Sequence, residues 1–194
     1  MTWCVWFTGL PGSGKSTIVD QFMRLLAERA IVARLLRLDD IRRRIVGHPE
    51  YTAEERDRVY AALAAMAAEA AASGHVVVDA TAHRRAWRDS VERAVPRYLE
   101  VLVDAPLEVC MAREAERPGG KVMAGIYRKA LERRDRGLAH DGLGEVVGVD
   151  VPYERSPRAF VLDSVGRGPA ENAWLVADEL ARRGWMDMAP DHRP

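Results

Sequence analysis

Short apolar runs alternate along this chain with segments in which apolar residues recur at helical spacing. The runs suit buried parallel strands, which the pattern predicts over residues 3–7, 31–38, 75–79, 98–104 and 159–162. Helices are predicted over residues 17–26, 52–72, 84–94, 106–113, 126–134 and 169–183. Strands that alternate with helices predict an α/β fold, a three-layer sandwich whose five-stranded parallel sheet carries helices on both faces.

A glycine-rich loop joins the first predicted strand to the first predicted helix. Gly9, Gly14, Lys15 and Ser16 fill the pattern G-x-x-x-x-G-K-[ST] of a phosphate-binding P-loop. Between a strand and a helix, such a loop points backbone N–H groups and the helix dipole at a phosphate. Lys15 is expected to reach the β- and γ-phosphates, and Ser16 to offer its hydroxyl to Mg²⁺. The predicted ATP-binding residues of a P-loop NTPase-type fold are therefore Gly9, Leu10, Pro11, Gly12, Ser13, Gly14, Lys15, Ser16 and Thr17. Thr17 can equally be an ordinary residue of the first helical turn.

Two aspartates follow predicted strands at the sheet edge that carries the P-loop. Ligands of open α/β sheets bind at this edge, outside the carboxyl ends of the strands. Asp39 follows the second strand, which we expect to neighbour the P-loop strand, and is predicted to be a general base; capping of the next helix is the alternative. Asp79 ends the third strand and is predicted to be an acidic Mg²⁺ residue with Ser16.

Composition and charge limit the classes of partner. The chain has 194 residues, with 29 Lys and Arg against 29 Asp and Glu, so no global field attracts nucleic acid or an anionic membrane. No apolar stretch approaches the ~20 residues of a membrane span, and the N-terminus does not resemble a signal peptide. Cys4 and Cys110 make no disulfide framework and are expected to be buried thiols. We predict a single cytoplasmic P-loop kinase domain over residues 1–194, with a lid segment at about 114–150.

Three further segments carry a more specific signal. They are Leu-Glu-Val-Leu-Val-Asp-Ala-Pro-Leu-Glu-Val-Cys-Met-Ala-Arg at residues 99–113, Gly-Ile-Tyr-Arg-Lys-Ala at 125–130 and Gly-Val-Asp-Val-Pro-Tyr-Glu at 148–154. These segments resemble the strand-four signature, the lid motif and the Gly-Ile-Asp-Asp-Pro-Tyr-Glu segment of the adenylylsulfate (APS) kinase family. The resemblance covers nearly the whole chain. It implies an enzyme that uses ATP and Mg²⁺ to phosphorylate the 3′-hydroxyl of adenosine 5′-phosphosulfate, and it leaves a homodimer open.

The same resemblance assigns roles to individual residues. Asp39 matches the expected base, so Asp39 and Lys15 are the predicted catalytic residues. Arg42 matches an arginine that would hold the phosphosulfate, and Tyr51 matches an aromatic residue that stacks on the acceptor's adenine. Arg113 is implied to contact ATP. The remaining residues implied to contact the acceptor are Arg56, Arg85 and Lys129.

The departures from the family pattern lie in the acceptor half of the site. Arg-Leu at residues 37–38 replaces the Asp-Gly before the base, and Val59 replaces an asparagine. Residues 82–85 read Ala-His-Arg-Arg where the family has Ser-Pro-Phe/Tyr-Arg. Arg84 thus replaces a stacking ring; an arginine can stack on a base, and it also suits a more anionic acceptor. His83 is open to three interpretations: a proton shuttle, a substrate contact or a surface residue.

Three functions are therefore in competition. The first is ATP-dependent phosphorylation of adenylylsulfate. The second is the same chemistry on a different small anionic metabolite, because the acceptor motifs are altered. The third is a nucleotide-binding module without catalysis, against which the presence of both Lys15 and Asp39 argues.

Overall fold

Five parallel strands form one sheet in the order β2-β3-β1-β4-β5, and every pairing in it is parallel. The computed structural model describes residues 1–47, 52–116 and 125–187. The strands are β1 (Cys4–Thr8), β2 (Ala33–Arg37), β3 (His75–Asp79), β4 (Tyr98–Asp104) and β5 (Phe160–Asp163). The α/β fold and five-stranded parallel sheet predicted from the apolar pattern are confirmed.

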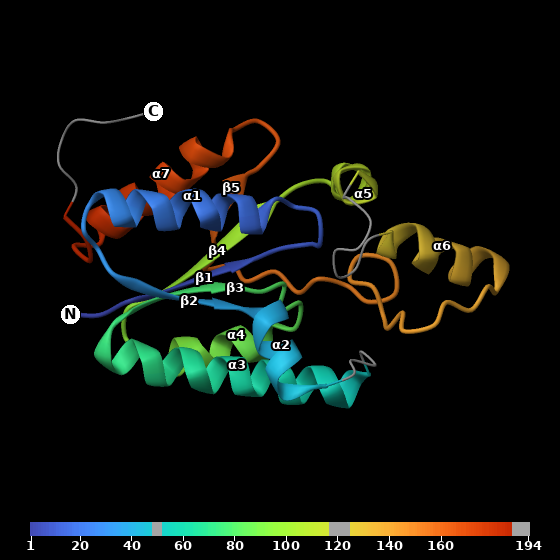
Figure 1. Cartoon of the computed structure of the whole chain (residues 1–194). Helices are drawn as coiled ribbons and strands as arrows, with labels where there is room; N and C mark the ends of the chain where they lie inside the picture. Colours follow the sequence, from blue (N-terminus) through green and yellow to red (C-terminus); the bar gives the residue numbers. More distant parts are fainter. Residues whose placement is uncertain (48–51, 117–124, 188–194) are drawn as a thin grey trace.

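Helices cover both faces of this sheet, which gives the predicted three layers (Figure 1). Helices α1 and α7 lie together on one face, α3 and α4 on the other, and α5 and α6 lie beyond the carboxyl ends of the strands. Their bounds are α1 (Lys15–Glu28), α2 (Leu38–Ile45), α3 (Ala53–Ser73), α4 (Arg85–Ala94), α5 (Leu107–Ala115), α6 (Ile126–Arg136) and α7 (Pro169–Arg182).

The central strand β1 supplies both hydrophobic cores, because its side chains alternate between the two faces of the sheet. Val5 and Phe7 pack with α1 and α7, whereas Cys4 and Trp6 pack with α3 and α4. Both cysteines are buried free thiols, as predicted, and burial raises the pKa of Cys4 to about 12. Cys110 belongs to a third, smaller apolar cluster that joins α5 to α6.

Two expectations about the second strand were wrong. β3 lies between β1 and β2, so the strand that neighbours the P-loop strand on this side ends at Asp79 and not near Asp39. Asp39 also lies inside a helix that was not predicted, since α2 begins at Leu38 directly after β2. Ile41 and Ile45 sit one turn apart in α2, and Ile41 is buried, but the arginines around them obscure this short apolar stripe.

A side-chain cap marks the start of α3. Thr52 is the N-cap, and its hydroxyl accepts a hydrogen bond from the backbone N–H of Glu55 at 3.1 Å. The side chain of Glu55 pairs with Arg42 of α2. The cap therefore fixes where α3 begins, and the helix then carries Arg56 and Tyr60 toward the same edge as the P-loop.

Candidate active site

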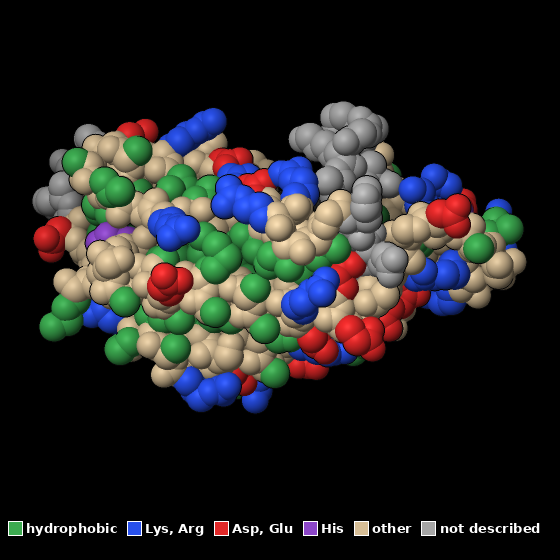
Figure 2. Space-filling model, turned by 60° about the horizontal axis from the view of Figure 1, so that its bottom comes forward, with side chains coloured by type: hydrophobic (Ala, Val, Ile, Leu, Met, Phe, Trp, Pro, Cys, Tyr) green, Lys and Arg blue, Asp and Glu red, His purple; other side chains and the backbone are tan. Residues whose placement is uncertain are grey.

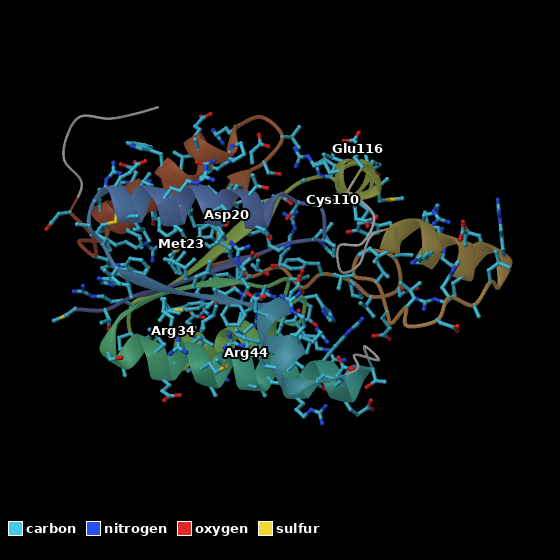
Figure 3. The ribbon with its side chains drawn as sticks, in the orientation of Figure 1. Asp20, Met23, Arg34, Arg44, Cys110 and Glu116 are labelled. Atoms are coloured by element: carbon cyan, nitrogen blue, oxygen red, sulfur yellow. The ribbon has the colours of Figure 1, made fainter. Side chains whose placement is uncertain are left out.

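Two glycines allow the P-loop to pack closely against the backbone of neighbouring elements. Gly9 has φ +140° and Gly12 has φ +82°, which is the region that side chains disfavour. A Cβ added to Gly9 would lie 2.4 Å from the carbonyl oxygen of Val103, and one on Gly12 would lie 2.2 Å from that of Cys110. Cys110 comes from α5 (Figure 3). The loop is therefore held against both β4 and α5, and neither position has space for a side chain.

Replacing Gly12 with alanine is expected to lower the free energy of unfolding by about 2–3 kcal/mol, through backbone strain and the clash with the Cys110 carbonyl. Gly74→Ala is the matched control, because Gly74 has an extended backbone and no atom within 4 Å of an added Cβ. Urea unfolding followed by circular dichroism measures both variants. Equal stability of the two variants would contradict the close packing of the loop.

Two polar side chains of the P-loop face the end of β3. The Lys15 ammonium is buried and donates to the carbonyl oxygens of Gly9 and Leu10, each at 2.9 Å. Ser16 donates its hydroxyl to the carboxylate of Asp79. Burial raises the pKa of Asp79, an effect that the Lys15 charge and the Ser16 hydrogen bond oppose. A hydroxyl and a carboxylate thus lie side by side below the predicted phosphate position.

One cavity of about 180 Å³ opens at this edge of the sheet. Its walls come from the P-loop, α2, α3, the end of β3 and the segment that follows α6. Asp39 is exposed in its wall, close enough to Asp79 that its charge adds to the raised pKa of that carboxyl. The lining residues are Pro11, Lys15, Ser16, Arg37, Leu38, Asp39, Arg42, Arg56, Tyr60, Asp79, Ala80, Thr81, His83, Ile126, Glu145, Val146 and Val147.

Two buried arginines line this cavity, and each is paired with a glutamate. Arg42 of α2 donates to Glu55 at 2.6 Å, and both side chains are buried. Arg56 of α3 donates to the carboxylate of Glu145 at 3.2 Å and to its backbone oxygen. Burial lowers the pKa of Arg56, and the charge of Glu145 opposes that change. The pairs keep two guanidinium groups in fixed positions, ready to bind an anion bidentately.

Helix α6 and the segment after it lie against the P-loop. Tyr127 of α6 donates its hydroxyl to the carbonyl oxygen of Pro11 at 2.9 Å. At the start of α6, the N–H groups of Gly125 and Ile126 donate to the carboxylate of Glu114, which is buried at the end of α5. The helix predicted inside the lid segment is therefore confirmed as α6; movement of that segment stays a prediction.

His83 and Tyr60 also line the cavity, and the rings of both residues contact Trp87. The rings of Tyr60 and Trp87 stack with centroids 4.1 Å apart, and the His83 ring meets Trp87 edge-on at 5.1 Å. The backbone N–H of Ala82 donates to the Tyr60 hydroxyl at 3.0 Å. Burial, with added effects of nearby arginines, lowers the pKa of His83 to about 4. Tyr60 was missed from sequence, although it lies one helical turn beyond Arg56 and so shares its face.

The other predicted site residues lie outside this cavity or outside the described residues. Tyr51 belongs to a stretch that the structure does not describe. Arg84 is half-exposed, paired with Asp57 and stacked over Trp87, and Arg85 is half-exposed and paired within α4. Lys129 lies half-buried on α6 but does not line the cavity. Their predicted contacts with an acceptor stay predictions.

Arg113 lies on the opposite side of the P-loop and contacts a second groove. Its guanidinium donates to the backbone oxygen of Ser13 at 3.4 Å and to both oxygens of Ser164, at 3.1 and 2.8 Å. The groove is lined by Gly14, Thr17, Ile18, Arg113, the loop 164–169 and Asn172. Arg113 thus joins the P-loop to the loop between β5 and α7, beside the start of α1.

A fully buried arginine, Arg88, connects the loop after β3 with the segment at residues 153–154. Arg88 donates to Glu100 at 3.0 Å and to the backbone oxygens of Ala82 and Glu154. Its guanidinium also lies over the ring of Tyr153, 5.1 Å from the centroid. Burial raises the pKa of Glu100, and Arg88 opposes that change. Removal of Arg88 would leave a buried carboxyl and two carbonyl groups without this partner.

Arg88→Met is expected to lower the free energy of unfolding by about 3 kcal/mol at neutral pH, because breaking a buried ion pair leaves Glu100 uncompensated. Arg93→Met removes an exposed arginine from the same helix and serves as the control. Urea unfolding measures both, and adding Glu100→Gln to Arg88→Met is expected to restore part of the loss. A loss no larger than that of Arg93→Met would contradict the role of Arg88.

The surface carries both signs of charge. Figure 2 shows basic and acidic side chains interspersed at the end of the molecule that carries α6. In the described ranges, no helix combines the length and apolar character needed to cross a membrane. The same ranges hold no cluster of three or more His, Cys, Asp or Glu residues arranged for a metal ion.

Comparison with known proteins agrees with the α/β fold and the P-loop. The family model described as adenylylsulphate kinase matches residues 1–162. The adenylyl-sulfate kinase of Rhodopirellula baltica is 28% identical over 211 aligned residues, which cover 95% of this chain and 79% of that protein. A second adenylyl-sulfate kinase, from Synechococcus sp. (strain JA-3-3Ab), is 32% identical, and the alignment covers 94% of this chain and 96% of that protein.

Solved structures show the same relationship. The APS kinase of Mycobacterium tuberculosis, in complex with AMPPNP and APS, superposes with a TM-score of 0.75 at 28% identity, covering 93% of this chain and 98% of that chain. A sugar kinase from Janibacter sp. shares the fold, with a TM-score of 0.64 at 22% identity. Because the family model matches most of the length of this chain, the chain belongs to the adenylylsulphate kinase family and is a kinase.

Proposed function

We propose that this kinase transfers the γ-phosphoryl group of ATP to the 3′-hydroxyl of adenosine 5′-phosphosulfate. The observation that carries the proposal is a single cavity lined by Lys15 of the P-loop, by Asp39, and by the buried arginines Arg42 and Arg56. One wall suits the phosphates of ATP and another suits the anionic end of an acceptor. A phosphoryl group can therefore pass between two ligands bound side by side.

ATP is the donor that the P-loop side of the site supports. Backbone N–H groups at the start of α1 would bind the phosphates, and the buried ammonium of Lys15 would leave its carbonyl partners for the β- and γ-phosphates. The groove beside Arg113 continues from the P-loop and would hold the nucleoside part of ATP. Arg113, held by Ser13 and Ser164, can stack on the base.

The oxygen donors beside the P-loop fit Mg²⁺. Ser16 and Asp79 would hold the ion together with phosphate oxygens, and this mixture of protein and substrate ligands is the usual one for Mg²⁺. When bound, Mg²⁺ would neutralise negative charge that develops on the phosphates during transfer. The hydrogen bond between Ser16 and Asp79 supports this assignment, because it places a hydroxyl oxygen and a carboxylate side by side, where both can serve as ligands.

Asp39 is proposed as the base. Its exposed carboxylate lines the cavity between the P-loop and the arginines, within reach of an acceptor hydroxyl. It would accept the proton of that hydroxyl as the oxygen attacks the γ-phosphorus in line with the departing ADP oxygen. Lys15 would stabilise the negative charge on the transferring group.

Arg42 and Arg56 are proposed to bind the acceptor's phosphosulfate. Both guanidinium groups are buried at the cavity wall, where a low dielectric strengthens their attraction for an anion. Their glutamate partners hold them in place and limit the net positive charge. The predicted adenine contacts of Tyr51, and the further acceptor contacts of Arg85 and Lys129, complete this proposal.

A different small anionic acceptor is the second candidate, and two observations favour it. Arg84, which takes the place of an adenine-stacking ring in the family pattern, pairs with Asp57 and stacks over Trp87 instead of lining the cavity. Val59, at the position of an asparagine, is fully buried and offers no hydrogen bond from its side chain. The adenine end of the acceptor site therefore lacks two of its usual polar and aromatic groups.

Coupled ADP formation with ATP and Mg²⁺ tests both candidates. The proposal predicts a large increase in rate on addition of adenylylsulfate, with phosphoadenylylsulfate as the second product. A panel of phosphorylated and sulfated alcohols tests the alternative. If folded protein binds ATP but responds to the panel and not to adenylylsulfate, the acceptor assignment is wrong. If it responds to neither, the third hypothesis, a nucleotide-binding module, gains support.

A further inference from the structure

His83 occupies an unusual position in the cavity. It is only 5% exposed, yet its side chain lines the cavity, and the edge of Trp87 supports its ring at 5.1 Å. Its backbone oxygen accepts from the N–H of Glu154 at 2.9 Å, which fixes the residue between two segments. Within the described ranges, no hydrogen bond engages the imidazole nitrogens. A hydrogen-bonding ring is thus held rigidly against the cavity with its polar atoms available.

The charges around His83 are mostly positive. Arg56 faces it from α3, and Arg84 and Arg88 face it from the start of α4 and from α4 itself. Glu154, on the segment after the lid, is the acidic group on the other side. Burial and these arginines lower the pKa of His83 to about 4, so the imidazole is neutral at physiological pH. A neutral imidazole keeps one N–H donor and one acceptor nitrogen.

We propose that His83 is an acceptor-binding and specificity-determining residue, whose ring N–H donates a hydrogen bond to an anionic oxygen of the acceptor beside Arg56. The inference rests on the proposed function, because it assigns His83 to the same acceptor site. The family pattern has proline at this position, which has no side-chain donor. An anion bound there would accept hydrogen bonds from both Arg56 and His83. Its negative charge would offset the positive charge around the imidazole.

Steady-state kinetics provide the first test. His83→Phe keeps a ring against Trp87 but removes the donor, and it is expected to raise the KM for the acceptor about tenfold, as loss of a hydrogen bond to a charged group does. The KM for ATP is expected to stay unchanged. His83→Gln, which retains an N–H donor, is expected to recover most of the affinity.

His75 offers a matched control. It also packs on a tryptophan, with its ring 4.3 Å from that of Trp3, and its pKa is also lowered by burial. It begins β3, at the opposite edge of the sheet from the cavity. His75→Phe is therefore expected to leave both KM values unchanged. Equal effects of the two phenylalanine variants on acceptor KM would overturn the proposal.

Nitrogen-15 NMR of labelled histidine rings gives a second readout on the wild-type protein. The probes are adenylylsulfate with MgADP, and sodium sulfate alone. Anion binding beside His83 is expected to raise its protonation midpoint, because negative charge favours the imidazolium form. The protonation midpoint of His75 is expected to stay unchanged. Signals are assigned through the His83→Gln and His75→Phe variants.

The two probes separate this proposal from the choice of acceptor. A response of His83 to sulfate but not to adenylylsulfate supports the proposal and rejects adenylylsulfate as the acceptor. A response to both supports both assignments. If His83 responds to neither probe, or if an acceptor that the enzyme turns over has the same KM in His83→Phe as in the wild type, the proposal is overturned.

Discussion

Replacing Lys15 with methionine is expected to slow acceptor-dependent ADP formation about 10³-fold, because the charge proposed to stabilise the transferring phosphoryl group is lost. Lys15 is buried, and its ammonium donates hydrogen bonds to the carbonyl oxygens of Gly9 and Leu10. Methionine has nearly the same length, so the aliphatic part keeps its packing while the charge is removed. Initial rates at saturating ATP and acceptor measure the effect on kcat.

The control for this variant is Arg24→Met, which removes a positive charge from an exposed position on the same helix α1. It is expected to react at the wild-type rate, so that a loss in Lys15→Met reflects the position of the charge and not the net charge. Thermal unfolding of both variants verifies that they are folded. A Lys15→Met enzyme within tenfold of wild type would exclude the proposed role.

Replacing Asp39 with asparagine is expected to lower kcat about 10²–10⁴-fold, the usual contribution of general-base help. The amide has the size of the carboxylate but does not accept the proton of the acceptor hydroxyl. ATP binding is expected to persist, because the P-loop contacts are unchanged. Single-turnover measurement with radiolabelled ATP separates the chemical step from product release.

Asp40→Asn is a close control for this substitution. Asp40 follows Asp39 in the same helical turn, but its carboxylate pairs with the exposed Arg43. The variant makes the same chemical change one residue away and is expected to retain the wild-type rate. If Asp39→Asn is equally active, another group serves as the base, and Asp79, buried beside Ser16, becomes the next residue to test.

The elements of this fold could be predicted because their signals are local. Each of the five strands overlaps a predicted apolar segment, and the P-loop and the start of α7 at Pro169 depend on residues close in sequence. The order of the strands depends on long-range packing, and sequence patterns do not specify which strand lies beside β1. The misplaced β2 follows from that difference, whereas α2 was missed because the arginines around Ile41 and Ile45 obscure its short apolar stripe.

The candidate site shows the same division. The P-loop residues were found because their spacing is required by phosphate binding itself. Glu145 and Tyr60 were not found, because each reaches the cavity only after α3 and the segment after α6 come together. The pairing of Glu55 with Arg42 was likewise not found, because Arg42 lies in a helix that was not predicted.

The strand order also has a consequence for altering this enzyme. The proposed acceptor contacts come from the β2 and β3 side of the sheet, through α2, α3 and the loop after Asp79, whereas the proposed ATP contacts beyond the P-loop come from the β4 and β5 side. β1 and its loop separate the two sets. A combinatorial library restricted to the β2 and β3 side can therefore explore new acceptors while the donor half keeps its native sequence.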